Sequence, residues 1–75
     1  MARSLRFALG AAIRATRQEH DVSQEELGHL AGLHRNHVGQ IERGELSPTI
    51  DTVELIAKAL SVSPSELVRR AETLR

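Results

Sequence analysis

Apolar side chains recur along this chain at steps of three and four residues, the spacing of one face of an α-helix. A first helix is expected over about residues 4–19, with inward positions at Leu5, Leu9, Ala12, Ile13 and Thr16. Another is expected over about residues 50–60, with inward positions at Ile50, Val53, Ile56, Ala57 and Leu60. No stretch alternates at every second residue as a half-buried strand would, so the pattern predicts an all-α fold.

Capping residues and glycines divide the chain between these two stretches. Ser23, with Glu26 three residues later, has the spacing of a capping box, so a second helix is expected to begin directly after Ser23. Gly32 ends this helix at about residue 31, because glycine readily takes the positive φ of a helix end. A third helix is expected over about residues 35–43, with Gly44 as its stop signal.

Two further caps mark the last helices. Pro48 excludes helix just upstream of Thr49, which is the expected cap of the helix over residues 50–60. Ser63, Pro64 and Glu66 form a second cap, with proline at the first helical position, and open a fifth helix over about residues 64–72. The 75 residues are therefore expected to form one five-helix domain over residues 1–75.

The amino-acid composition limits the kind of core that this domain can form and the cellular compartment that suits it. Phe7 is the only aromatic residue, so the core must be aliphatic, and the lack of cysteine removes disulfides and suits a reducing cytoplasm. The basic and then apolar start imitates a signal peptide, but Arg14 interrupts its apolar run. No stretch approaches the roughly 18 apolar residues of a membrane span. We therefore expect a cytoplasmic protein without membrane association.

Charge alone does not indicate a nucleic-acid partner. Ten basic and ten acidic side chains leave a formal net charge of zero with the histidines neutral. A protein that coats nucleic acid without reading its sequence usually carries a basic excess. A protein that reads DNA through a local basic face remains compatible with this balance.

The second and third helices are separated by only about three residues, so they must cross at a steep angle. Gly28 and Ala31 are small enough for a tight crossing. The apolar residues expected to hold it together are Leu27, Leu33, Val38 and Ile41.

The third helix carries an unusual polar face. Val38 and Ile41 point inward on a helical wheel, whereas Asn36, Gly39, Gln40 and Arg43 point outward. Asn and Gln match an adenine edge and Arg matches guanine, and Gly39 is expected to let the helix lie close to the floor of a major groove. The alternative is an ordinary solvated face. Lys and Glu would be usual there and neither occurs on this face, so DNA reading is favoured.

These residues carry a family resemblance. The segment SQEELGHLAGLHRNHVGQIERG resembles the helix-turn-helix of the lambda-repressor-like family, also called the Cro/phage-repressor or XRE type. The similarity continues through SPTIDTVELIAKALSVSPSEL, which resembles the fourth and fifth helices of that family. The resemblance implies a sequence-specific, DNA-binding transcriptional regulator with its helix-turn-helix over about residues 23–44. The chain looks most like restriction-modification controller proteins and similar stand-alone regulators.

The resemblance also implies roles for single positions. The base-reading positions are Arg35, Asn36 and Gln40. The phosphate-contacting positions are Gln24, Arg43 and Ser47. Arg17 and Glu42 match an ion pair that links the first and third helices. Two independent surface charges are the alternative for that pair, and an ordinary early-helix residue is the alternative for Gln24.

The histidines, and a search for catalytic motifs, say less about the function than the third helix does. His34 and His37 are expected to flank the DNA face and contact phosphates. Together with His29 they could hold zinc or nickel, but no carboxylate or thiolate completes such a set in convincing register. No nucleophile elbow or phosphate-binding glycine loop occurs, so we expect no enzyme activity, cofactor or small-molecule ligand.

Leu55 lies away from the inward stripe of its helix, and Val68 adds a further apolar position on the fifth helix. These two residues are predicted to form the seam of a homodimer, which would bind double-stranded DNA at a palindromic operator. The rival interpretation is a protein-interaction module or antitoxin of the same fold, in which DNA contact is secondary.

Overall fold

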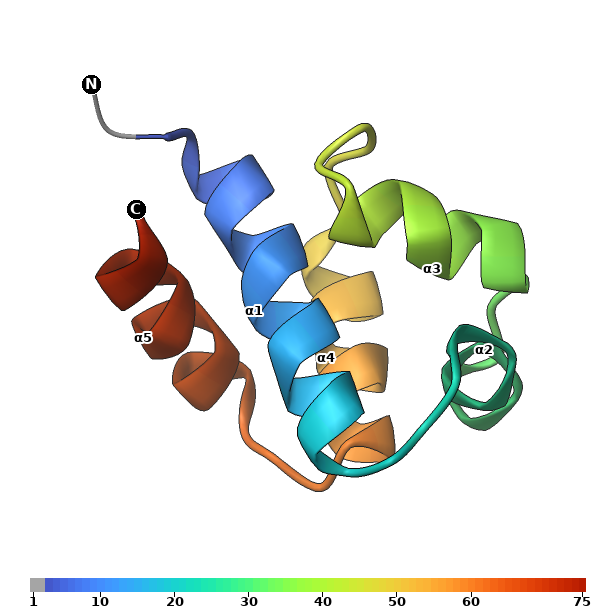
Figure 1. Ribbon diagram of the computed structural model, residues 1–75. Helices are drawn as coiled ribbons and strands as arrows, with labels where there is room; N and C mark the ends of the chain where they lie inside the picture. The colour runs from blue at the N-terminus through green and yellow to red at the C-terminus, as the bar shows by residue number, and fades with distance from the viewer. Residues whose placement is uncertain (1–2) are drawn as a thin grey trace.

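The protein is seen here as a computed structural model that describes residues 3–75, with five α-helices joined by short loops (Figure 1). They are α1 (Leu5–Glu19), α2 (Gln24–Ala31), α3 (Arg35–Glu42), α4 (Ile50–Ala59) and α5 (Pro64–Leu74). No strand occurs over residues 3–75, so the predicted all-α architecture is confirmed. The largest difference from a predicted range is at α5, which continues to Leu74 instead of stopping near residue 72.

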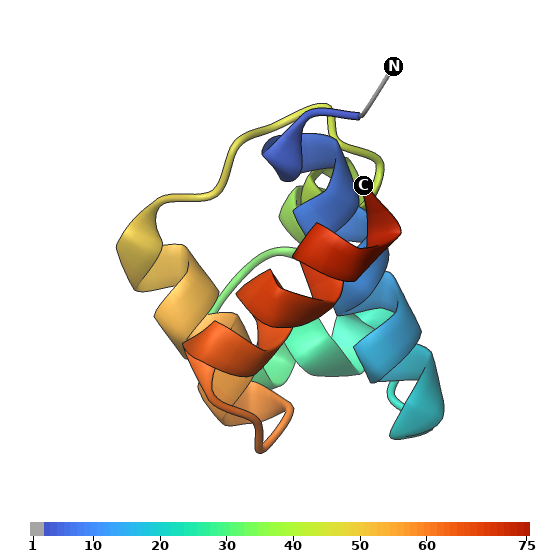
Figure 2. The same ribbon diagram turned by 90° about the vertical axis from the view of Figure 1, so that its left-hand side faces the viewer.

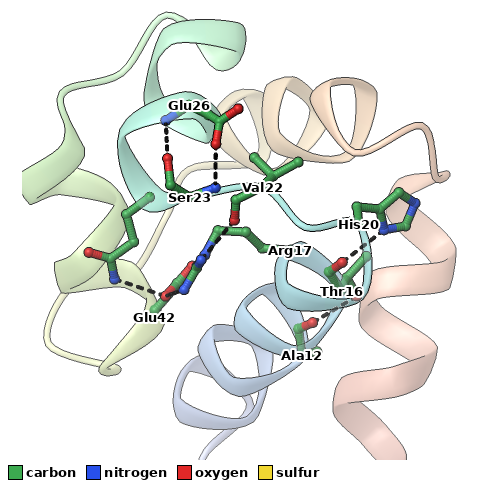
Figure 3. A network of polar contacts seen from close by, with 9 residues as sticks. Ala12, Thr16, Arg17, His20, Val22, Ser23, Glu26 and Glu42 are labelled. Atoms are coloured by element: carbon green, nitrogen blue, oxygen red, sulfur yellow. Dashed lines mark hydrogen bonds and ion pairs between the residues drawn. The ribbon is translucent and has the colours of Figure 1, made fainter.

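The predicted caps open the helices. The Ser23 side chain accepts a hydrogen bond from the Glu26 backbone N–H at 3.0 Å, and the Glu26 carboxylate accepts one from the Ser23 N–H at 3.0 Å (Figure 3). The hydrogen bond from the Ser23 backbone N–H to the Glu26 carboxylate, followed by the interaction with the Ser23 side chain, lowers the pKa of the Glu26 carboxyl. Ser63 and Glu66 form a second capping box, and the Thr49 hydroxyl caps α4. A cap of this kind stabilises a helix by about 0.5–2 kcal/mol.

The core lies around α1, which runs between α5 on one side and α3 on the other (Figure 1). In addition, α4 packs against α2 and α5. The largest fully buried side chains are all aliphatic, as the composition predicts: Ile13, Leu27, Val38, Ile41, Ile56, Leu60 and Leu67. Each contributes roughly 1.5–3 kcal/mol of burial free energy.

Two predicted core positions were wrong. Ile50 is 85% exposed and Leu5 is 37% exposed. Each is the first residue of its helix, and a helical Cα–Cβ bond tilts toward the helix N-terminus. Their side chains therefore point past the last neighbour that could cover them. Figure 2 shows α4 beginning at the outer edge of the bundle.

Close backbone approaches fix α3 on both sides. A Cβ added to Gly28 on α2 would lie 2.5 Å from the Leu33 carbonyl oxygen, so the α2–α3 crossing requires glycine there. Gly32 completes the turn with φ at 73°. Gly10 on α1, which the sequence analysis did not single out, would place a Cβ 2.2 Å from the Ile41 carbonyl oxygen. As a result, α3 is held directly against the backbone of α1.

Candidate nucleic-acid interface

One side of α3 is anchored in the core and the other is exposed. Val38 and Ile41 are 0% and 1% exposed, whereas Arg35, Asn36 and Gln40 lie on the surface. Within residues 3–75, the side-chain amides of Asn36 and Gln40 make no hydrogen bond to another residue; only the backbone N–H of Asn36 is bonded, to His34. The donors and acceptors of both amides are therefore free to meet a ligand.

Arg35 begins α3 and forms an ion pair with α2. Its Nη1 lies 3.3 Å from Glu25 Oε2, and both side chains are largely exposed. Exposed pairs of this kind stabilise a protein by only about 0–1 kcal/mol. An incoming phosphate or guanine edge can therefore replace the Glu25 carboxylate at little energetic cost.

His34 caps α3 instead of simply facing solvent. Its Nδ1 accepts a hydrogen bond from the Asn36 backbone N–H at 3.1 Å. A ring that accepts at Nδ1 carries its proton on Nε2, and a doubly protonated ring could not accept at all. A phosphate contact by His34 would therefore use the neutral ring as an Nε2–H donor. His37, one turn later, is half-buried. Over residues 3–75, no three or more His, Cys, Asp or Glu side chains lie close enough together to hold a metal ion.

A buried polar network joins α1, α2 and α3 (Figure 3). Arg17 Nε donates to Glu42 Oε2 at 2.7 Å and Arg17 Nη2 donates to Glu42 Oε1 at 3.1 Å, with side-chain exposures of 11% and 2%. Arg17 Nη1 donates to the Val22 carbonyl oxygen at 2.8 Å. The structure thus brings the two predicted ion-pair residues into a bidentate contact that also fixes the loop before α2.

Gln24 belongs to the same network. Its Nε2 donates to Glu42 Oε1 at 3.0 Å, and its side chain is half-buried at the start of α2. An amide nitrogen carries two hydrogens, so one donor remains for a phosphate. The predicted phosphate role of Gln24 stays a prediction, and the contact with Glu42 would hold the amide in place for it.

The expectation for Gly39 was wrong. Gly39 is buried and does not face outward beside Asn36 and Gln40. A Cβ there would lie 2.9 Å from Arg43 Nη1 and 3.6 Å from Gln24 Oε1, so these two side chains cover it. Position 39 lies on the flank of α3 that turns toward the start of α2. The missing side chain makes room for the side chains of Arg43 and Gln24.

Arg43 and Ser47 lie beyond the C-terminal end of α3. Arg43 is the C-cap, and its Nε and Nη2 donate to the two oxygens of Glu45 at 2.8 and 3.2 Å. These hydrogen bonds lower the pKa of the Glu45 carboxyl and raise that of the Arg43 guanidinium. Ser47 is exposed in the loop before α4. The predicted phosphate residues therefore lie at both ends of α3.

The arrangement of α2 and α3, two tightly packed helices with one exposed polar face, is matched by a known protein family. A family model described as helix-turn-helix matches residues 13–67. The chain belongs to the helix-turn-helix family. Control protein C.SmaI of Serratia marcescens is 39% identical over 62 residues, which cover 83% of this chain and 74% of that protein.

Solved structures agree with this helix-turn-helix assignment. The restriction-modification controller protein C.AhdI of Aeromonas hydrophila superposes with a TM-score of 0.80 at 36% identity, covering 81% of this chain and 92% of the other. The clp gene regulator ClgR of C. glutamicum superposes with a TM-score of 0.93 at 26% identity, covering 96% and 94%. The predicted lambda-repressor-like fold is confirmed.

Two carboxylates of this helix-turn-helix were not predicted from the sequence. Glu25 and Glu45 each hold an arginine at one end of α3, Arg35 and Arg43 respectively. The only sequence signal was the two-residue spacing of Arg43 and Glu45, because Glu25 and Arg35 meet only after α2 and α3 cross.

No helix over residues 3–75 has the length and apolar character needed to cross a bilayer.

Proposed function

We propose that this helix-turn-helix protein regulates transcription by inserting α3 into the major groove of a specific operator, with Arg35, Asn36 and Gln40 contacting base edges. The exposed polar face of α3 carries this proposal, since its amides are free while Val38 and Ile41 anchor the opposite face. Asn and Gln offer a donor and an acceptor together, which suits adenine, and Arg offers two donors, which suits guanine.

Backbone contacts would set the register of α3 in the groove. Gln24 and the two histidines His34 and His37 lie near its N-terminal side, and Arg43 and Ser47 lie beyond its C-terminal end. Phosphate contacts at both ends position a reading helix without reading sequence themselves. Glu25 and Glu45 would be displaced from their arginines as DNA binds.

We also propose a homodimer whose seam contains Leu55 on α4 and Val68 on α5. These apolar side chains are 45% and 36% exposed, and both belong to elements other than the reading helix. A two-fold axis would place two copies of α3 about 34 Å apart, one turn of DNA, so the operator should be palindromic.

The similarity to C.SmaI and C.AhdI favours a controller of a restriction-modification system or a comparable stand-alone regulator. A dimer that regulates its own gene responds steeply to its own concentration, which suits a timing switch. The protein would act in the cytoplasm, with double-stranded DNA and its own second copy as partners. We propose no catalytic role, cofactor or small-molecule ligand.

Selection from a random pool of duplex DNA tests this function. We expect the bound fraction to become enriched in one palindromic motif over successive rounds. Failure to enrich any motif would overturn the proposal. It would instead favour the protein-interaction or antitoxin alternative, in which the α3 face meets a protein.

Replacing Gln40 by alanine should relax specificity at one operator position. The lost amide contact should reduce discrimination at that base pair by about 1–3 kcal/mol, because a bidentate base contact is worth that much. Fluorescence anisotropy against a panel of single-base operator variants measures the effect. Arg43→Gln is the contrasting variant, since loss of a phosphate contact should weaken binding to every duplex alike. The same uniform loss from Gln40→Ala would contradict a base-reading role.

A further inference from the structure

A shallow depression of about 430 Å³ lies between one face of α1 and the C-terminal end of α3. The residues of α1 that line it include Phe7, Arg14 and Gln18, and Arg3 lies just before α1. Glu42 and Arg43 complete it at the end of α3. The depression is therefore continuous with the proposed DNA-binding surface but uses a helix that lies outside the helix-turn-helix.

The depression is basic in a chain of zero net charge. Among residues 3–75, the one carboxylate that lines it is Glu42, which Arg17 already neutralises in the buried pair. Arg14 is exposed and has no carboxylate within ion-pair distance over residues 3–75, and the Arg3 guanidinium lies 4.6 Å from the Phe7 ring centroid instead of beside an acid. Two guanidinium groups are thus uncompensated at this site.

The end of α3 needs this positive charge if a phosphate is to approach it. Unpaired carbonyls at a helix C-terminus carry partial negative charge, which repels anions. The last turn of α3 contains no basic residue, and the C-cap Arg43 is paired with Glu45 until DNA displaces that carboxylate. Gly10 brings α1 into backbone contact with Ile41, and Arg14, one turn later on α1, lines the same depression as Glu42 and Arg43 at the end of α3.

We propose that this depression is an additional binding site for the sugar-phosphate backbone of double-stranded DNA, with Arg14 as its principal donor and Gln18 and Arg3 beside it. The inference rests on the proposed function, because α3 must enter the groove for the neighbouring strand to pass the end of α3. Arg matches the oxygens of a phosphate with two parallel donors. The contact would add affinity on every sequence and no base discrimination.

The test compares Arg14→Gln with Arg6→Gln. Arg6 is also an exposed arginine of α1, but it does not line the depression and is turned about 80° around the helix from Arg14. Both proteins are titrated, over a range of salt concentrations, against a labelled random-sequence duplex and against the duplex recovered by selection. Thermal unfolding of each variant checks that the fold is retained.

We expect Arg14→Gln to weaken binding about tenfold on both duplexes, as loss of one charged hydrogen-bonding group would. The slope of log affinity against log salt should fall by about 0.9, the value for one lost phosphate contact. Arg14→Lys should retain most of the slope, and Arg6→Gln should match the wild type.

Two outcomes would overturn the inference. One is a salt slope for Arg14→Gln equal to that of Arg6→Gln, and the other is a loss confined to the selected duplex. If the wild-type protein prefers no duplex at all, the proposed function itself fails. If the wild type selects an operator and Arg14→Gln still behaves like Arg6→Gln, only the additional backbone site fails.

Discussion

Replacing Leu55 by glutamate should convert the proposed homodimer to a monomer and lower operator affinity by about a thousandfold or more. The substitution puts a charge into the apolar seam, and a monomer engages only one half-site with half of the contacts. A specific complex is commonly at least a thousand times tighter than non-specific binding. A monomer that reads one half-site should lose most of this margin. Sedimentation equilibrium measures the mass, and fluorescence anisotropy measures the affinity.

The matched control for this seam is Leu30→Glu. Leu30 is an exposed leucine at 60% and belongs to α2, whereas the proposed seam consists of residues of α4 and α5. We expect the Leu30 variant to remain dimeric. Since Leu55 is already 45% exposed in the single chain, the Leu55 variant should keep its helical circular-dichroism spectrum. A Leu55→Glu protein that sediments as an unchanged dimer would exclude this seam.

Replacing Glu42 by alanine should lower the free energy of unfolding by about 3–5 kcal/mol, because the guanidinium of Arg17 would remain buried without its partner. Gln24 would lose its acceptor in the same step. The total stability of a small domain is only about 5–15 kcal/mol, so the variant should be close to unfolded at physiological temperature. Urea unfolding at one fixed protein concentration measures the change, since the proposed dimerisation would make stability concentration-dependent.

Two further variants test whether the loss of stability comes from leaving a buried charge without its partner. Glu45→Ala removes a carboxylate of the same type from the exposed pair with Arg43, and its unfolding midpoint should stay near that of the wild type. The double variant Arg17→Met, Glu42→Leu removes both buried charges and should regain much of the stability that Glu42→Ala loses. Similar losses from Glu42→Ala and Glu45→Ala would show that burial of the pair has no special role.

Most of the fold was predictable because the decisive interactions are local. Ser23 and Glu26 meet across three residues, as do Ser63 and Glu66, and each pair determines where a helix begins. The polar face of α3 was also predictable, since Asn36 and Gln40 are one helical turn apart whatever the rest of the chain does. The exceptions at helix starts are Leu5 and Ile50, where the period continues but no neighbour covers the first turn.

The candidate site was less predictable because its contacts join distant segments. The Arg17–Glu42 pair was expected only from a family resemblance, since its partners are 25 residues apart in the chain. Gly39 was expected to be exposed but is buried. A helical wheel does not include the neighbouring α2, whose Gln24 helps to cover that flank of α3. Neither the pairing of Arg35 with Glu25 nor the depression beside Arg14 has any signal in residue spacing.

The sequence by itself determined the five helices, the caps of α2, α4 and α5, the aliphatic core and the identity of the outward side chains of α3. Periodicity and capping act within one or two turns, and residue spacing records them directly. Only the tertiary structure decided which carboxylate holds which arginine, what covers Gly39 and which face of α1 lies beside the end of α3. Those features depend on how closely whole helices approach, and the contacts of Gly10 and Gly28 set that approach between residues that are not neighbours in the chain.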